Sequence, residues 1–331
     1  MTDRDPGGAW RPLASPVYRR LWLAQVGGNL GTWMQNVGAQ WLIVTATGSA
    51  LLVGLVQTAS TLPVVLLAAP AGVLADILDR RRLLVGVQLS MVVAASVLAA
   101  LTFLGLATPA VVLGFTFVLG CGAALIWPAW QAIQPELVSR EQIPQAAALA
   151  AVNMNAARAV GPALGGLLVA AAGAGWVFAL NAASFLLVAL VVASWNRTVV
   201  PDPAGRERMI AGLRSGARYV RHARSMRRII AQSLLFVPIA TAVWALLPLV
   251  ASRQLDAGAG GYGLLLGALG LGAVAGSMVL PVVRRRMSLG GLLTVLFVLY
   301  ALATAALAVT SALAVAIAVR AVAGAAWLGP R

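Results

Sequence analysis

Residues 21–75 read LWLAQVGGNLGTWMQNVGAQWLIVTATGSALLVGLVQTASTLPVVLLAAPAGVLA and contain no Asp, Glu, Lys or Arg. A helix that crosses the hydrocarbon core of a bilayer needs about 20 apolar residues. A tract of this length therefore predicts two membrane-spanning helices joined by a turn. Residues 142–196 form a similar tract, with Arg158 as its single charge. The other uncharged tracts are 83–135, 229–252, 257–283 and 287–319.

The composition of the whole chain agrees with this reading. Of the 331 residues, 61% are hydrophobic and only 10% are charged, and the mean hydropathy is +0.91. A water-soluble domain carries about 25% charged residues, so the composition excludes an ordinary soluble enzyme. A single cysteine, Cys121, and a single histidine, His222, give no basis for a disulfide or a metal centre. We therefore expect no cofactor and no metal.

These features predict an all-α polytopic membrane protein. Turn-forming residues such as Gly48 and Pro109 separate paired spans within the long tracts. We expect nine complete spans and the start of a tenth, at 20–44, 50–75, 83–106, 110–134, 145–171, 176–195, 229–252, 262–283, 289–309 and 312–328.

The arginines predict the orientation of these spans. With the N-terminus in the cytoplasm, twenty of the 24 arginines lie in cytoplasmic segments and only Arg253 lies in an outside loop. Basic residues collect on the cytoplasmic side of membrane proteins, so we expect a multi-pass protein of the cytoplasmic membrane. The net charge of +15 is explained by these clusters. Membrane lipid, rather than nucleic acid, is the partner they indicate, and the oligomeric state stays open.

The longest loop divides the chain into three parts. We expect an N-terminal six-helix bundle at 1–195, a cytoplasmic linker at 196–228, and an incomplete C-terminal bundle of three spans and a partial fourth at 229–331. The linker is read as a basic amphipathic helix on the inner leaflet, with a solvated linker as the alternative. A shift of 204 residues aligns Arg80 with Arg284 and indicates a parallel repeat of six-helix bundles, the second apparently truncated.

The loop GVLADILDRRR at residues 72–82 joins spans two and three on the predicted cytoplasmic side. It resembles the signature loop of the major facilitator superfamily, although Ile77 and Asp79 depart from that pattern. The resemblance implies a gating loop that latches the two halves of a transporter in one conformation. The residues in register with the signature are Gly72, Leu74, Ala75, Asp76, Arg80 and Arg81.

Span five contains RAVGPALGG at residues 158–166. A proline inside a helix can bend it, and glycines four residues apart let another helix approach closely. The stretch resembles the superfamily's antiporter signature, Gly-Pro-x-x-Gly-Gly, which implies an exporter and a bend and seal between its halves. The alternative is ordinary small-residue packing. The matching residues are Gly161, Pro162, Gly165 and Gly166.

Polar side chains recur on one face of span one. At 100° per residue they fall within an arc of about 80°. Amides that faced lipid would lack hydrogen-bond partners, so this stripe is predicted to line a substrate cavity, or else to bond other helices. We expect spans one, four, five, seven and eight to form the cavity. The stripe is Gln25, Asn29, Thr32, Asn36 and Gln40, with Trp33 beside it; Thr241 and Trp244 join it from span seven.

Arg158 is the only charge within the first six spans. A charge inside a membrane is costly and indicates a function or a partner. No carboxylate lies within a span, and the nearest acidic residues are Asp76 and Glu136. Arg158 is therefore predicted to pair with such a group or with helix carbonyls, or to face an anionic substrate in the cavity.

Several further stretches resemble the transmembrane secretion effector group of the major facilitator superfamily, which includes enterobactin exporters and macrolide efflux proteins. They are YRRLW at 18–22, GTWMQ at 31–35, PAW at 128–130 with PEL at 135–137, and GYGLL at 261–265. The resemblance runs from about residue 16 to 320. It implies a transporter that exports a small organic molecule, siderophore-like or drug-like, by alternating access and as a secondary antiporter.

The chain has no lysine and so no nucleotide-binding Gly-x-x-x-x-Gly-Lys loop. An ion gradient, such as that of protons, is the energy source expected, although Thr116 stands where the superfamily's drug–proton antiporters often have an arginine. An intramembrane enzyme would need a carboxylate pair or histidine cluster, and a channel would need rings of polar residues; neither pattern is present. The alternative is an inactive or assembly-dependent fragment of a transporter, from a truncated or frameshifted reading frame.

Overall fold

The computed structural model of the chain describes residue 8 and residues 10–197, 243–284 and 287–327. Within these ranges the structure is helical and contains no strand. Nearly all of the predicted linker, with its amphipathic helix, lies outside them, as does Thr241.

Each predicted span that falls on described residues coincides with a helix. Residues 243–249 are also helical, and a π-helix at Val250–Gln254 follows them. The main helices are α1 (Pro16–Thr47), α2 (Ala50–Ile77), α3 (Arg80–Phe103), α4 (Pro109–Leu137), α5 (Ile143–Ala172), α6 (Ala174–Ser194), α9 (Gly258–Arg284), α10 (Leu289–Val309) and α11 (Leu313–Trp327).

Seven helices of the described part are long and apolar enough to cross a membrane. The first helix, α1, is not among them because its polar stripe lowers its hydropathy, and α11 is a shorter apolar helix. Large apolar side chains such as Val65, Met278 and Val309 are 74–84% exposed on the surface of the molecule. A surface of this kind suits lipid and not water, so the chain is a multi-pass membrane protein.

Short polar residues set the helix boundaries. The side chains of Ser49, Asp79 and Thr108 accept hydrogen bonds from backbone amides in the first turns of α2, α3 and α4. Such caps satisfy amides that have no partner within the helix. Gly48 ends α1 in the left-handed conformation, with φ of 60°, that favours glycine. These caps explain why the uncharged tracts break into paired helices where they do.

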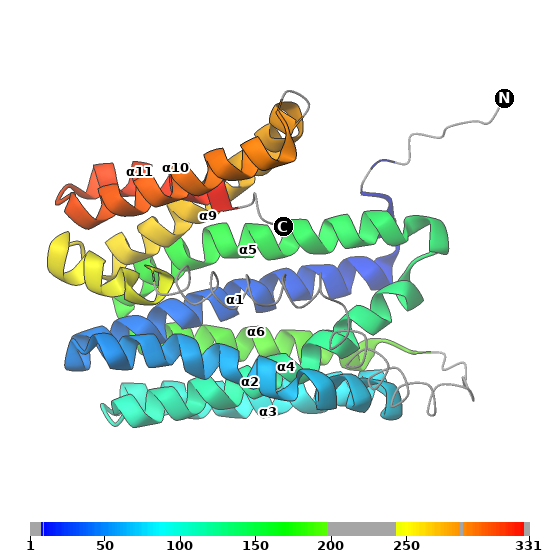
Figure 1. The fold of residues 1–331 in the computed structure, drawn as a ribbon. Coiled ribbons are helices and arrows are strands. Elements are labelled where there is room, and N and C mark those ends of the chain that lie inside the picture. The colour runs from blue at the N-terminus through cyan, green and yellow to red at the C-terminus, as the bar shows by residue number, and fades with distance from the viewer. Residues whose placement is uncertain (1–7, 9, 198–242, 285–286, 328–331) are drawn as a thin grey trace, which may run out of the picture.

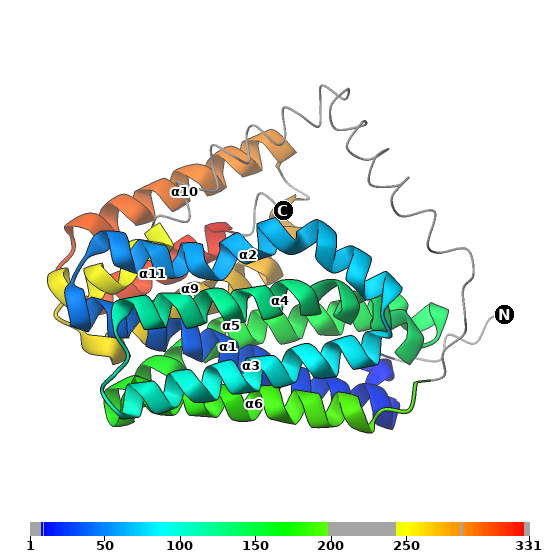
Figure 2. The ribbon, with the colours of Figure 1, turned by 90° about the horizontal axis from the view of Figure 1, so that it is seen from below.

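The first six helices form one bundle. In it α1 packs against α5 and α6, α3 against α6 and α4, and α2 against α4. The later helices join this bundle mainly through α9, which packs along α5, while α11 packs on α9 and α10 on α11 (Figure 1). Seen from below, α10 lies at the far edge of the molecule from α3 and α6 (Figure 2).

The packing repeats as the sequence predicted. The pairs α2–α4 and α3–α4 of the first half correspond to α9–α11 and α10–α11 of the second. The offset of 204 residues carries Pro109, the first residue of α4, to Leu313, the first residue of α11. The all-α fold with a parallel repeat is therefore confirmed in the described residues.

Candidate substrate cavity

A small polar cavity of about 100 Å³ lies where the first six helices meet the later ones. Its wall includes tryptophan rings and amide side chains, so a molecule within it would meet both apolar surface and hydrogen-bonding groups. The lining residues are Trp33, Asn36, Val37 and Gln40 of α1, Gln57 of α2, Trp244 of the helix at 243–249, and Tyr262 and Leu266 of α9.

A buried hydrogen bond crosses this cavity wall. The hydroxyl of Tyr262 donates to Oε1 of Gln40 at 2.8 Å, and the Tyr262 ring stacks on Trp41 with centroids 6.4 Å apart. Both bonded side chains are buried. Because a buried polar group without a partner is costly, this bond ties α9 to α1 at the cavity.

The predicted stripe on α1 divides between two roles. Trp33, Asn36 and Gln40 line the cavity. Thr32 is exposed and donates to the Gly28 carbonyl of its own helix at 2.8 Å. The three lining residues therefore face the cavity, which was one of the two alternatives that the sequence left open.

The other end of the stripe bonds a neighbouring helix. Gln25 donates to Asn29 at 3.2 Å, and Asn29 donates to Asn153 of α5 at 3.0 Å. Asn153 in turn donates to the Trp22 carbonyl at 3.3 Å. For Asn29 the structure therefore shows interhelical hydrogen bonding, which was the alternative left open by the sequence, whereas the bond of Gln25 stays within α1.

Arg158 lies beside the cavity, against one of its lining residues. Its guanidinium carbon is 5.5 Å from the ring centroid of Trp33, within the range of a cation–π contact. The ion pairs shown for Asp76 and Glu136 are with Arg80 and Arg197. Arg158 thus sits against a lining residue, with its charge over the aromatic face.

The predicted antiporter motif packs against α1 on one side and against α9 of the second half on the other. A Cβ added at Gly161 would approach the Trp33 side chain of α1 to 2.6 Å, and one at Gly165 would approach Met34 Cα to 2.8 Å. A Cβ at Gly166 would come within 2.5 Å of the Ala259 carbonyl oxygen of α9. Only glycine allows backbones to approach this closely.

The same contact is formed from the α9 side. A Cβ at Gly263 would lie 2.5 Å from the Pro162 carbonyl oxygen and 2.9 Å from Gly166 Cα. A Cβ at Gly267 would lie 3.2 Å from both the Ala159 carbonyl and Ala163 Cβ. Pro162 lies within the continuous helix α5. Small residues on both helices therefore bring α5 and α9 into backbone contact.

The predicted gating loop is held by ion pairs at the end of the bundle away from Gly48. Arg80 Nη1 is 2.6 Å from Glu136 Oε1 of α4, and Arg80 Nη2 is 3.6 Å from Asp76. Arg197, just after α6, lies 2.7 Å from Glu136 and 2.8 Å from Asp79. These contacts join α2, α3, α4 and the segment after α6, all within the first six helices.

The remaining loop residues have different surroundings. Arg81 donates to the carbonyls of Val192 and Ala193 at the end of α6. Ala75 is buried, whereas Leu74 is exposed. A Cβ at Gly72 would meet no atom of the described residues within 4 Å, so no close helix contact is seen at this glycine. The latch across the two halves stays a prediction.

The charges around Asp79 shift its titration. Partial burial works against ionisation, but the Arg82 amide and the Arg197 guanidinium both stabilise the carboxylate, and together they lower the pKa of Asp79. The hydrogen bond of Arg197 to Glu136, and its weaker contact with Asp79, raise the pKa of Arg197 although partial burial works against its charge. Asp79 and Arg197 are therefore both charged at neutral pH.

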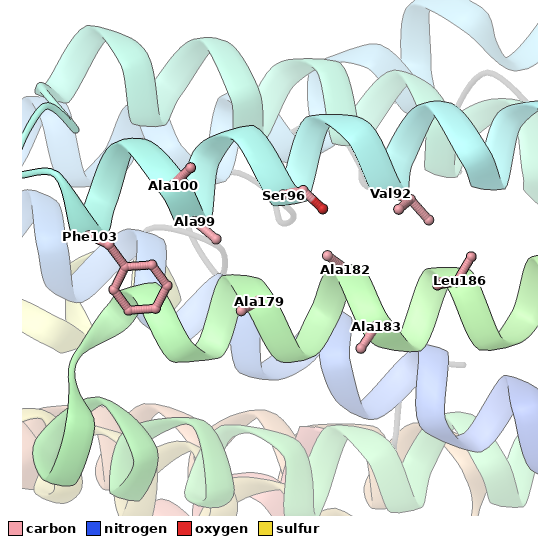
Figure 3. A pocket seen from close by; sticks show the side chains of 9 residues that line it. All are labelled: Val92, Ser96, Ala99, Ala100, Phe103, Ala179, Ala182, Ala183 and Leu186. Carbon is pink, nitrogen blue, oxygen red and sulfur yellow. The ribbon is translucent and has the colours of Figure 1, made fainter.

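A larger hollow of about 360 Å³ lies between α3 and α6 (Figure 3). Its wall is almost wholly apolar and offers Ser96 as its polar side chain. Two of its lining residues, Phe103 and Leu186, are 54% and 40% exposed at the outer surface. This hollow is a groove on the face that suits lipid and a poor match for a substrate site.

Three features of the cavity region were absent from the sequence-based site. Gln57 of α2 and Tyr262 of α9 line the cavity, whereas none of the described residues that line it comes from α4 or α5. Arg320 of α11 is only 1% exposed. A lone charge in an apolar tract was the signal available for Arg320; a single glutamine or tyrosine in a long tract gives no comparable signal.

Comparisons with known proteins agree with this arrangement. The sequence pattern of the transmembrane secretion effector family matches residues 7–330. The staphyloferrin A transporter of Staphylococcus aureus (strain NCTC 8325 / PS 47) is 26% identical over 253 residues, which cover 76% of this chain and 64% of that protein. The enterobactin exporter EntS of Shigella boydii serotype 18 is 30% identical over 248 residues, covering 72% of this chain and 53% of EntS.

Solved structures share the fold. The nucleoside transporter NupG superposes with a TM-score of 0.70 at 14% identity, covering 94% of this chain and 79% of NupG. A bacterial homologue of the iron transporter ferroportin in an inward-facing state gives a TM-score of 0.64 at 17% identity, covering 95% of this chain and 81% of that one.

The chain thus spans about 64% and 53% of the length of the two curated relatives. The family pattern nevertheless extends over almost all of its residues, and the helical repeat is that of the solved transporters. On this evidence the chain belongs to the transmembrane secretion effector family of the major facilitator superfamily.

Proposed function

We propose that this protein exports a small organic molecule, siderophore-like or drug-like, across the cytoplasmic membrane by alternating access. The observation that carries this proposal is the position of the polar cavity. Its lining residues come from α1 and α2 on one side and from residues 243–249 and α9 on the other. A site between two helical bundles is exposed to either side in turn when the bundles rock against each other.

The contacts between the halves support one closed end. Arg253 Nη2 donates to the Gly48 carbonyl at 2.7 Å, and the Tyr262–Gln40 bond and the α5–α9 contact lie toward the same end. The arginine distribution assigns this end to the outside. The proposed state is therefore closed to the outside, and its cavity of about 100 Å³ is smaller than the 300–1,000 Å³ typical of ligand sites. The cavity widens as the halves separate.

The family and the sequence support the proposed direction and energy source. One relative is named as an enterobactin exporter and another as a staphyloferrin A transporter. The chain lacks lysine and hence a nucleotide-binding loop of the Gly-x-x-x-x-Gly-Lys type. We therefore assign export to secondary antiport against an ion gradient, for which protons are the first candidate. The gating loop and the Gly-Pro-x-x-Gly-Gly segment regulate closure in this scheme.

A second candidate is a chain that transports only in association with further helices. Its support is the length of the relatives, of which this chain spans about half to two thirds. In that case the cavity wall would be completed by segments outside this chain.

The test is efflux of a compound panel from cells that express this chain and, separately, a version extended to twelve spans. Export by both supports the first proposal, and export by the extended version alone supports the second. No difference from empty cells in either would remove the exporter proposal.

Paired variants connect efflux to the cavity. Gln57→Leu removes a lining amide, whereas Gln88→Leu changes a buried glutamine of α3 away from the cavity. Efflux is expected to fall severalfold for the first and to persist for the second. Arg158→Gln tests the charge against Trp33; a variant that folds and exports normally removes Arg158 from the mechanism.

A further inference from the structure

Arg320 lies in the middle of α11, seven residues from each end of that helix. At 1.5 Å per residue its Cα is about 10 Å from either helix end. The whole residue is 1% exposed, and it is the largest side chain in the described core. Its position excludes a simple role as an anchor at the lipid headgroups.

The guanidinium of Arg320 has no hydrogen-bond partner among the described residues. All three of its nitrogens, Nε, Nη1 and Nη2, are buried without one. The preceding span of the second half offers no carboxylate side chain either, because residues 208–255 contain neither Asp nor Glu. A buried charge without a counter-charge is strongly unfavourable. Among the described residues, this charge therefore lacks an anionic partner.

The surroundings of Arg320 add further unused donors. The indole nitrogen of Trp244 and the hydroxyl of Tyr300 are also buried without a partner among the described residues. Trp327 connects them, with ring centroids 6.1 Å from Trp244 and 5.6 Å from Tyr300. The side chains of Tyr262 and Tyr300 lie within electrostatic range of the guanidinium.

This cluster shares two residues with the cavity wall. Trp244 and Tyr262 line the cavity, and Tyr262 also holds Gln40 on its wall. The repeat places Arg320 where the first half has Thr116, whose hydroxyl donates to the carbonyl of Val112 at 2.7 Å within its own helix. The charge is therefore a feature of the second half alone.

We propose that Arg320, with the Trp244 N–H and the Tyr300 hydroxyl, is a binding subsite for the carboxylate of the exported molecule. This inference rests on the proposed function, because it assigns a chemical class to the substrate of the same cavity. The planar guanidinium presents two parallel donors that match the two oxygens of a carboxylate. The surrounding tryptophan and tyrosine rings supply apolar contact for the organic part of the molecule.

The test measures binding to the full chain, purified in detergent, with benzoate and its neutral analogue benzamide as probes. Wild type is expected to bind benzoate at least tenfold more tightly than benzamide. Arg320→Gln is expected to lose that preference while its benzamide affinity stays the same. Arg140→Gln, which changes an exposed arginine away from the cavity, serves as the control and keeps the preference.

Protein stability provides a second readout that does not depend on a probe's fit. Without added anion, Arg320→Met is expected to unfold at a temperature no lower than wild type, because it removes an unpaired buried charge. Benzoate is expected to raise the unfolding temperature of wild type and not that of Arg320→Met. A marked loss of stability in Arg320→Met, with no anion effect on wild type, would assign Arg320 a structural role and overturn the proposal.

The remaining outcomes separate this inference from the proposed function. Equal stabilisation of wild type by chloride and by benzoate would overturn the carboxylate subsite in favour of an inorganic anion site. Benzoate binding that depends on Arg320 in a chain without efflux would uphold the subsite and remove the exporter. If the wild type exports neutral compounds but shows no preference for benzoate, the exporter proposal is upheld and the carboxylate subsite is removed.

Discussion

Replacing Gly263 of α9 by alanine tests the close contact between the two halves. The added Cβ would lie 2.5 Å from the Pro162 carbonyl oxygen, 0.9 Å inside the 3.4 Å at which ordinary contact begins. Both α5 and α9 present backbone at this point, so no side chain can move aside. The helices must separate, and overpacking of this kind costs about 1–3 kcal/mol.

The chain contains a matched series on the same helix. A Cβ at Gly260 would meet its nearest neighbour, Ala170 Cβ, at 4.0 Å, whereas one at Gly267 would meet two atoms at 3.2 Å. All three alanines gain the same helix propensity, about 0.5–1 kcal/mol over glycine. The difference between Gly263→Ala and Gly260→Ala therefore isolates the steric cost, with Gly267→Ala between them.

The assay is unfolding of the purified variants in detergent, together with efflux. We expect Gly263→Ala to be about 1–3 kcal/mol less stable than Gly260→Ala. If the contact forms in only one of the two alternating conformations, this steric cost changes the ratio of the two conformations about 5- to 150-fold. Efflux is then expected to fall as well. Equal stability of the two variants would refute the backbone contact between α5 and α9.

Three further predictions follow from the polar contacts. Glu136→Gln removes the carboxylate shared by two arginines and is expected to cost about 1–3 kcal/mol in thermal unfolding, whereas Glu141→Gln at an exposed site should change little. Because folding lowers the pKa of Asp79, its carboxylate contributes its full stabilisation of the fold at pH values above the ordinary pKa of 3.8. That stabilisation is lost as the pH falls through the lower pKa of the folded state. Asp79→Asn should therefore flatten the acid limb of a stability–pH profile. Tyr262→Phe leaves the Gln40 oxygen buried and unpaired, at a cost of about 1–3 kcal/mol of stability. In a double-mutant cycle with Gln40→Leu, the two stability losses should be coupled, and strictly additive losses would contradict the hydrogen bond.

Much of the fold was predictable because hydropathy is a local property. The cost of placing charge in lipid limits each span to an uncharged tract, and caps such as Ser49 and Thr108 then set where helices begin. The predicted repeat places Pro109 and Leu313 at equivalent positions, and both begin helices. The Gly-Pro-x-x-Gly-Gly segment was likewise recognisable, since glycine spacing on one helix is visible in the sequence.

The composition of the cavity was decided only by the tertiary structure. The stripe on α1 was evident, but only packing assigned Asn29 to Asn153 of α5 and Gln40 to Tyr262 of α9. Gln57 joined the cavity and Arg320 became buried because of how their helices are rotated and tilted against others. A sequence fixes the face of a helix on which a residue lies, whereas the neighbour of that face depends on contacts between segments up to 222 residues apart.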